Sequence, residues 1–132
     1  TLRKLVPASL VIRAAAPASG ESIPVRLRFD DGQEVPLDQT MAIGRAPEGS
    51  EHVPPGAVIV VVSGEQVSRC HVVIRPGPEG AEVVDTNSLN GCFIESSDRP
   101  GTGPQLPVGV PVPVGPGQIL RFGDRSLTVL AR

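Results

Sequence analysis

Short stretches of alternating apolar and polar residues recur along the chain, separated by clusters of Gly, Pro and Asp. The clearest is residues 23–29, IPVRLRF, in which every second residue is apolar. A period of two residues is typical of a β-strand with one buried face. Residues 30–32, Asp-Asp-Gly, are a turn signal, so residues 34–37 are expected to return as the antiparallel partner strand.

The same pattern predicts further short strands, and no stretch of the sequence has the 3.6-residue period of an amphipathic helix. The strands are expected at residues 40–43, 58–62, 70–74, 81–84, 92–94, 118–122 and 126–130, with an edge strand or extended segment at 108–114. Residues 58–62 are continuously apolar, which predicts burial on both faces or under a loop. Many short strands separated by turns indicate an all-β sandwich.

Three segments lie outside these predicted strands. Residues 46–57 form a Pro/Gly/Glu loop that is longer than a hairpin requires, and residues 95–107 are predicted to be a mobile loop. Residues 1–22 are expected to be an N-terminal extension with room for an extra strand and a small-residue linker, and residues 23–132 the domain itself. Because the chain does not begin with Met, we expect it to be part of a longer protein.

The composition narrows the classes of function. A length of 132 residues fits one domain. The net charge is −2 and the chain has no Trp or Tyr, whereas a general nucleic-acid binder needs a basic excess and aromatic stacking platforms. No apolar run approaches the ~18 residues that span a bilayer, so no direct membrane contact is expected from this segment. Any anion site must therefore be local, built from two or three cations and backbone amides.

Cys70 and Cys92 are the two cysteines of the sequence. Their number and spacing fit neither a disulfide scaffold nor a zinc motif, so we interpret them as small buried apolar residues, with a disulfide and a reactive thiol as alternatives. No metal and no cofactor is predicted. A nucleophile–base pair of Cys70 with His71 is excluded because neighbouring strand residues point to opposite faces. The sequence also lacks a Gly-rich nucleotide loop, which argues further against an enzyme.

Two cationic positions stand at predicted strand ends. Arg45 follows Gly44 directly after a strand, and its guanidinium fork matches a phosphate bidentately. Ser68 and Arg69 add a hydroxyl donor and a second guanidinium just before another strand. His71 is expected to share a strand face with Arg69 and to bond the backbone of the loop. Taken singly, each also fits an ordinary role as a surface arginine, a turn-capping serine or a structural histidine.

The turn that follows the strand at 81–84 is the third candidate. Asp85 is expected to bind loop amides and hold the loop rigid, and Ser88 begins a Ser-Leu-Asn-Gly turn. Asn90 and Gly91 are expected to supply positive φ angles. The Asn90 amide is also able to pair with both backbone groups of an extended peptide. A plain Asn-Gly hairpin turn is the alternative interpretation of the same residues.

The order and spacing of these motifs together resemble the forkhead-associated (FHA) domain. The matching residues are 43–45 (IGR), 67–71 (VSRCH), 85–91 (DTNSLNG), 117–119 (GQI) and 122–123 (FG). The resemblance extends over about residues 23–130. It implies an all-β, eleven-stranded β-sandwich of the SMAD/FHA type, whose loops at one end bind phosphothreonine peptides.

The resemblance also implies a role for each candidate residue. Arg45 would contact the phosphate or the ligand backbone beside it, Ser68 and Arg69 would contact the phosphate, and Asn90 would hold the peptide main chain. The scaffold positions of the site would be Gly44, His71, Asp85, Ser88 and Gly91.

The sequence departs from the family pattern in two places. Leu89 stands where the family has a threonine whose hydroxyl helps to line the phosphate site. Glu48 and Glu51 lie on the long loop and would repel a dianion if they face the site. Two functions therefore stay open: a phosphothreonine-dependent protein-interaction module, and an FHA-like scaffold or self-association domain that no longer reads phosphate.

The first function implies a partner and a compartment. The expected partner is a phosphothreonine-containing protein or peptide, such as a Ser/Thr kinase or its substrate, acting in signal transduction, and no nucleic acid. The expected localisation is cytoplasmic, either as a free protein or as the cytoplasmic part of a longer or membrane-attached one.

Overall fold

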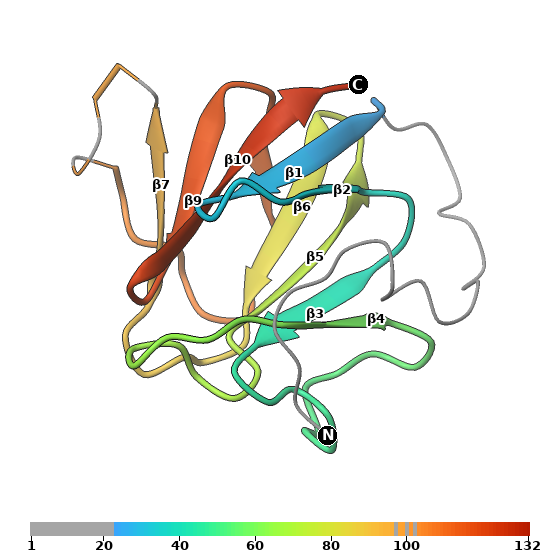
Figure 1. Ribbon diagram of the computed structural model, residues 1–132, viewed down its shortest axis with the longest axis vertical. Coiled ribbons are helices and arrows are strands. Elements are labelled where there is room, and N and C mark those ends of the chain that lie inside the picture. The colour runs from blue at the N-terminus through green and yellow to red at the C-terminus, as the bar shows by residue number, and fades with distance from the viewer. Residues whose placement is uncertain (1–22, 97, 100, 102) are drawn as a thin grey trace.

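Two five-stranded β-sheets pack face to face in the computed structural model, which describes residues 23–96, 98–99, 101 and 103–132 (Figure 1). The described residues form ten strands and no helix. They therefore contain no helix that could cross a membrane. The all-β sandwich predicted from the sequence is confirmed. The described strands are one fewer than the eleven that the resemblance implies, and the strand expected within residues 1–22 lies outside the described residues.

The first sheet is antiparallel and has the strand order β2-β1-β10-β9-β7. Its strands are β1 (Val25–Phe29), β2 (Glu34–Pro36), β7 (Cys92–Ser96), β9 (Gln118–Phe122) and β10 (Arg125–Ala131). The two predicted hairpins, β1–β2 and β9–β10, are both present. Figure 1 shows β1 in blue beside β10 in red, so the first and the last strand of the domain are neighbours.

The second sheet has the strand order β4-β3-β5-β6-β8. Its strands are β3 (Met41–Gly44), β4 (Val58–Val61), β5 (Val72–Gly77), β6 (Gly80–Asp85) and β8 (Val112–Val114). β3 and β4 are parallel, whereas the other pairs of this sheet are antiparallel. A parallel pair cannot be closed by a tight turn, and this explains why the loop at residues 45–57 is long.

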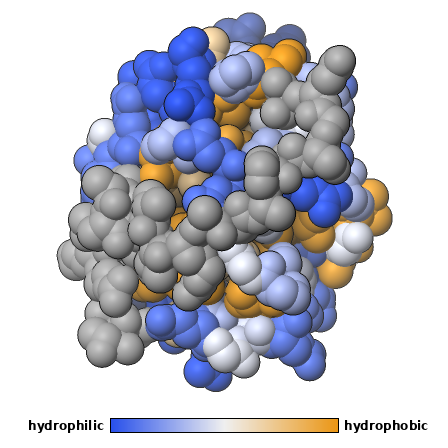
Figure 2. All heavy atoms as spheres, turned by 90° about the vertical axis from the view of Figure 1, so that its right-hand side faces the viewer, coloured by the Kyte–Doolittle hydropathy of each residue, from blue (hydrophilic) through white to orange (hydrophobic). Residues whose placement is uncertain are grey.

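The core lies between the two sheets and is almost entirely aliphatic. One face of each strand supplies it, as the period of two in the sequence predicts. The largest fully buried apolar side chains are Phe29, Phe122, Leu27, Ile43, Ile74, Leu120 and Leu127. On the side of the molecule that Figure 2 shows, the hydrophobic residues outside the grey atoms appear as separate areas among hydrophilic ones, an ordinary distribution for a protein exterior.

A second, smaller apolar cluster covers the outer face of the second sheet. It consists of Ala42, Ala57, Cys70 and Val73, with Val53 and Ile59 packed against it. Val53 and Ala57 belong to the β3–β4 loop, so this loop is anchored on the sheet near its C-terminal end. The cluster buries β3 on both faces.

The structure corrects two element predictions. The strand expected at 70–74 begins only at Val72 and extends to Gly77, so that the chain at residues 68–71 is a loop. The loop expected at 95–107 is shorter, because β7 extends to Ser96 and residues 104–106 return along its edge. Ile94 donates its N–H to the carbonyl of Pro104 at 3.1 Å, and Leu106 donates to the carbonyl of Cys92 at 2.8 Å.

Candidate functional site

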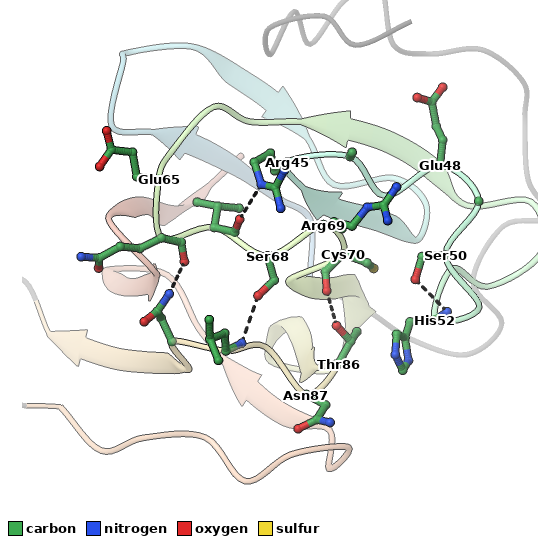
Figure 3. Close-up of a pocket in the computed structure, with 16 residues that line it drawn as sticks. Arg45, Glu48, Ser50, His52, Glu65, Ser68, Arg69, Cys70, Thr86 and Asn87 are labelled. Carbon is green, nitrogen blue, oxygen red and sulfur yellow. Dashed lines mark hydrogen bonds between the residues drawn. The ribbon is translucent and has the colours of Figure 1, made fainter.

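Three loops meet at one end of the sandwich and enclose a hollow of about 570 Å³ (Figure 3). They are the β3–β4 loop at residues 45–57, the β4–β5 loop at residues 62–71 and the β6–β7 loop at residues 86–91. The four residues predicted to bind a phosphopeptide all line this hollow: Arg45, Ser68, Arg69 and Asn90. The convergence expected from the sequence is present, while the binding roles of these residues stay predictions.

The first two loops are held together by backbone hydrogen bonds. The N–H of Arg45 donates to the carbonyl of Ser68 at 2.9 Å, and the N–H of Ala46 donates to the carbonyl of Arg69 at 3.0 Å. Gly44 makes this approach possible, because a Cβ at this position would lie 2.1 Å from the carbonyl oxygen of Arg69. No larger residue fits at this position. Because position 44 is glycine, the two loops that carry Arg45 and Arg69 are able to lie against each other.

Arg45 is exposed and is fixed at one atom only. Its Nε donates to the carbonyl of Val67 at 3.2 Å. No other side-chain hydrogen bond or ion pair of Arg45 occurs within the described residues, so both terminal nitrogens remain available. A guanidinium held in this way presents two parallel N–H donors, the geometry that suits a phosphate.

Ser68 is oriented by three contacts. Its backbone N–H donates to Nδ1 of His71 at 3.0 Å, and its carbonyl accepts the N–H of Arg45. Its hydroxyl oxygen accepts the backbone N–H of Leu89 at 3.0 Å. Since one lone pair of the hydroxyl is used by Leu89, the hydroxyl hydrogen remains to be donated to an anion in the hollow.

Arg69 is exposed beside Arg45, whereas His71 is completely buried. The prediction that the two side chains share a strand face is therefore wrong. The reason is that residues 68–71 are a loop, in which alternation of faces does not hold. Figure 3 shows Arg45, Ser68 and Arg69 next to one another at the hollow.

Two arginines, Arg45 and Arg69, and two glutamates, Glu48 and Glu65, line the hollow. Six arginines elsewhere pair with carboxylates: Arg26 and Arg28 with Glu34, Arg75 with Glu82, Arg121 with Glu95, Arg125 with Asp30, and Arg132 with Asp38. Arg45 and Arg69 belong to no ion pair in the described part of the chain. Their charges are therefore not neutralised by the protein, which favours an anionic ligand.

Asn90 is partly committed within the protein. Its Nδ2 donates to the carbonyl of Gln66 at 3.0 Å, which joins the β6–β7 loop to the β4–β5 loop. Its Oδ1 and the second hydrogen of Nδ2 have no partner among the described residues. Asn90 is thus able to pair with a peptide backbone while its position is held by Gln66.

Asp85 and Ser88 shape the β6–β7 loop. Oδ1 of the buried Asp85 accepts the N–H of Asn87 at 3.0 Å and the N–H of Ser88 at 2.8 Å, as expected from the sequence. The hydroxyl of Ser88 accepts the N–H of Gly91 at 3.0 Å. Gly91 has the expected positive φ of 79°, but the asparagine with a positive φ is Asn87, at 81°, and not Asn90. The tight bend therefore begins earlier than predicted.

His71 connects the β4–β5 loop to the β6–β7 loop from inside the core. Its Nδ1 accepts the N–H of Ser68, so Nε2 carries the proton and donates to the carbonyl of Gly91 at 2.9 Å. Burial lowers the pKa of His71 below its ordinary value of 6.5, although the bond to Gly91 and the charge of Asp85 act in the other direction. The imidazole is therefore neutral at physiological pH and serves as a structural link.

The sequence reasoning missed the support that the β9–β10 turn gives to the site. Asp124 accepts the N–H groups of Glu65 and Gln66 at 3.2 and 3.3 Å. Gly123 has a φ of +66°, and a Cβ at this position would lie 2.3 Å from the carbonyl oxygen of Gln66. The Phe-Gly step noted in the sequence marks this contact, but only the fold shows which loop it supports.

Both cysteines are free and buried, as interpreted from the sequence. Burial raises the pKa of the Cys70 thiol, and burial with the charge of Asp85 raises that of Cys92. Raised pKa values disfavour the reactive thiolate. No group of three or more His, Cys, Asp or Glu side chains in the described residues is arranged to hold a metal ion.

A β-sandwich whose loops at one end enclose a hollow with two arginines that are unpaired within the described residues is the architecture of a binding domain. The profile of the FHA domain matches residues 41–123, which is more than half of the chain. The chain belongs to the FHA domain family. FHA domains are protein-interaction modules and are generally not enzymes. No curated protein sequence matches the chain.

Solved FHA domains share its fold at low sequence identity. The FHA domain of the CT664 protein from Chlamydia trachomatis is 19% identical, with a TM-score of 0.62 over 83% of this chain and 98% of that one. An FHA domain solved for phosphothreonine-dependent FHA interactions is 24% identical, with a TM-score of 0.55 over 83% and 97%. EmbR from Mycobacterium tuberculosis, in complex with a low-affinity phosphopeptide, is 23% identical, with a TM-score of 0.58 over 86% and 26%.

Proposed function

We propose that this FHA domain binds segments of a partner protein that carry a phosphothreonine. The observation that carries the proposal is that Arg45, Ser68 and Arg69 line one hollow with donor atoms that the protein leaves unpaired. A phosphothreonine has about −1.5 to −2 charge at pH 7 and three acceptor oxygens. Two guanidinium groups and one hydroxyl satisfy these oxygens in the way that clustered cations recognise phosphorylated motifs.

In this proposal each residue has a separate role. The terminal nitrogens of Arg45 bind the phosphate while Nε stays on Val67. Ser68 donates its hydroxyl hydrogen to a phosphate oxygen, and Arg69 adds the second charged contact. Asn90 pairs with the peptide main chain through the amide atoms that Gln66 does not use.

The scaffold of the site has a separate function, which is to fix the three loops before the ligand arrives. His71, Asp85 and Ser88 hold the loops through the hydrogen bonds described above, and Gly44 and Gly91 allow their close turns. Loops that are already ordered lose little conformational entropy on binding, so more of the interaction energy appears as affinity.

Two structures with the same fold support a phosphoprotein as the partner. One concerns phosphothreonine-dependent FHA interactions, and the other holds EmbR with a phosphopeptide. We further propose that the partner here is a Ser/Thr kinase or its substrate, and that the domain acts in signal transduction in the cytoplasm.

The test uses the whole chain and a peptide library with a fixed central phosphothreonine and varied neighbours. The same library with unphosphorylated threonine and with phosphoserine provides the controls. We expect enrichment of phosphothreonine peptides only, and calorimetric titration of the best sequences should give no measurable binding after dephosphorylation. Equal capture of phosphorylated and unphosphorylated peptides would reject the proposal.

The second candidate function is a scaffold or self-association domain that no longer reads phosphate. It is favoured by Leu89, which offers no hydroxyl to the hollow and is 90% exposed. Self-association would appear as a concentration-dependent mass in sedimentation equilibrium, with no change when phosphopeptide is added. This combination of results would select the scaffold function over the phosphothreonine module.

A further inference from the structure

We propose that the phosphothreonine site selects ligands with basic residues on both sides of the phosphothreonine. The inference rests on the proposed function and adds the chemistry of the partner segment. It comes from two carboxylates at the hollow, those of Glu48 and Glu65, which lie on either side of the cationic centre formed by Arg45 and Arg69. Figure 3 shows Glu65 and Glu48 separated by Arg45.

The two carboxylates come from different loops. Glu48 lies on the β3–β4 loop and Glu65 on the β4–β5 loop, and both residues are exposed. The sequence raised the concern that Glu48 and Glu51 repel the phosphate. In the structure Glu48 lines the hollow, Glu51 is not among its lining residues, and the arginines lie nearer the middle.

Neither Glu48 nor Glu65 is neutralised by the protein. The carboxylates of Glu34, Glu82 and Glu95 each pair with an arginine, but Glu48 and Glu65 form no ion pair within the described residues.

The hollow therefore presents negative, positive and negative charge in succession. A phosphothreonine neutralises the centre, and its neighbours in an extended peptide then meet the carboxylates. Lysine or arginine at these neighbours gives complementary charge, whereas acidic neighbours meet like charge. Such repulsion discriminates against wrong partners as effectively as attraction selects right ones.

The expected size of the preference follows from the exposure of the carboxylates. Exposed ion pairs are individually weak, so each basic neighbour should raise affinity about two- to fivefold. Replacing lysine by glutamate removes the attraction and adds repulsion, and with both sides changed the ratio should reach about tenfold or more. The preference should diminish as salt is added, because exposed charges are screened over about 8–10 Å at physiological ionic strength.

The test uses four phosphothreonine peptides of equal length in fluorescence anisotropy. One has alanine on both sides, one has lysines on both sides, one has glutamates on both sides, and one has lysines before and glutamates after the phosphothreonine. They are titrated against the wild-type chain and against Glu48→Gln, Glu65→Gln and the double variant. Glu79→Gln is the charge-matched control, because Glu79 lies in the turn after β5, at the far end of that strand from the hollow.

We expect the lysine peptide to bind most tightly to the wild type and the glutamate peptide least. Each single variant should reduce this ratio, the double variant should nearly abolish it, and Glu79→Gln should leave it unchanged. Equal affinities of the lysine and glutamate peptides for the wild type would overturn the inference but not the proposed function. A ratio unchanged in the double variant would also overturn it. No binding of any phosphorylated peptide would reject the proposed function, and with it the inference.

Discussion

The hydroxyl oxygen of Ser68 accepts the backbone N–H of Leu89 at 3.0 Å, and this bond joins two loops through residues that are twenty-one positions apart in the sequence. This bond determines what each residue still offers to a ligand. Ser68 keeps a hydroxyl hydrogen to donate, and Leu89 has no backbone N–H left. The Leu89 side chain, 90% exposed, is then the part of this residue that a ligand meets.

Replacing Arg45 by alanine should abolish measurable binding of a micromolar phosphopeptide. The change removes charge-assisted bonds of about 1.5–3 kcal/mol each, and we expect a total loss of roughly 2–4 kcal/mol. Calorimetric titration measures the loss directly. Arg75→Ala is the matched control, because Arg75 is also an exposed arginine but pairs with Glu82 on the second sheet. Retained affinity in Arg45→Ala would mean that the phosphate binds elsewhere.

Replacing Leu89 by threonine should strengthen phosphothreonine binding. The new hydroxyl adds a donor beside Ser68, worth about 1–2 kcal/mol, which is roughly a five- to thirtyfold change in affinity. Leu89→Val separates the hydroxyl from the change of shape, since valine has the shape of threonine without the oxygen. If the two variants bind alike, the hydroxyl does not reach the phosphate. The exposure of Leu89 makes a loss of stability unexpected in either variant.

The folded protein should lose stability as the pH falls below about 6.5. The pKa of His71 is lowered in the folded state, so below 6.5 the unfolded chain takes up a proton that the folded imidazole does not. The stability that the neutral His71 imidazole contributes is retained above pH 6.5. Below pH 6.5 the free energy of unfolding should fall by up to about 1.4 kcal/mol per pH unit. Urea titrations between pH 7.5 and 5 measure this slope, in a range above most carboxylate titration.

A His71→Gln variant provides the control for this prediction, because it removes the buried imidazole and should flatten the pH dependence. In NMR spectra the His71 imidazole should titrate below pH 6.5. A His71 pKa at or above 6.5 would contradict the prediction, because it would mean that Nδ1 is protonated at the expense of its bond from the Ser68 N–H.

Replacing Gly123 by alanine should destabilise the domain and weaken ligand binding. A Cβ there would meet the carbonyl oxygen of Gln66 at 2.3 Å and displace the β4–β5 loop. Gly117→Ala is the control, because Gly117 also has a positive φ, +91°, but has no atom within 4 Å of the added Cβ. The difference between the two variants in thermal or urea unfolding isolates the clash, and we expect about 1–3 kcal/mol. Equal stabilities would show that the β4–β5 loop adapts freely.

The period of two was sufficient to predict most of the strands, because each strand has one face in the core. It failed at residues 70–71, where Cys70 and His71 are both buried in a loop and therefore imitate the start of a strand. It also could not show that β3 and β4 are parallel, since pairing direction depends on the path of the chain and not on which residues are apolar.

The candidate site was predictable to the extent that its residues follow a family pattern. Arg45, Ser68, Arg69 and Asn90 were named from the sequence and line one hollow. Gln66 was not, because it acts through its backbone carbonyl, which any residue type could supply. Asp124 was not, because its carboxylate meets the N–H groups of residues 65 and 66, which are distant in the sequence. The positive φ was expected at Asn90 and lies at Asn87, whose N–H is held by the Asp85 carboxylate.

The parallel pairing of β3 and β4 has a consequence for protein engineering. Because the chain must cross from one end of β3 to the opposite end of β4, the segment between them has to be long whatever its sequence. Its apolar anchors, Val53 and Ala57, lie near its end, while Glu48 lies nearer its beginning. Residues 48–52, which lie between Arg45 and these anchors, can thus be exchanged to change ligand preference without rebuilding either sheet.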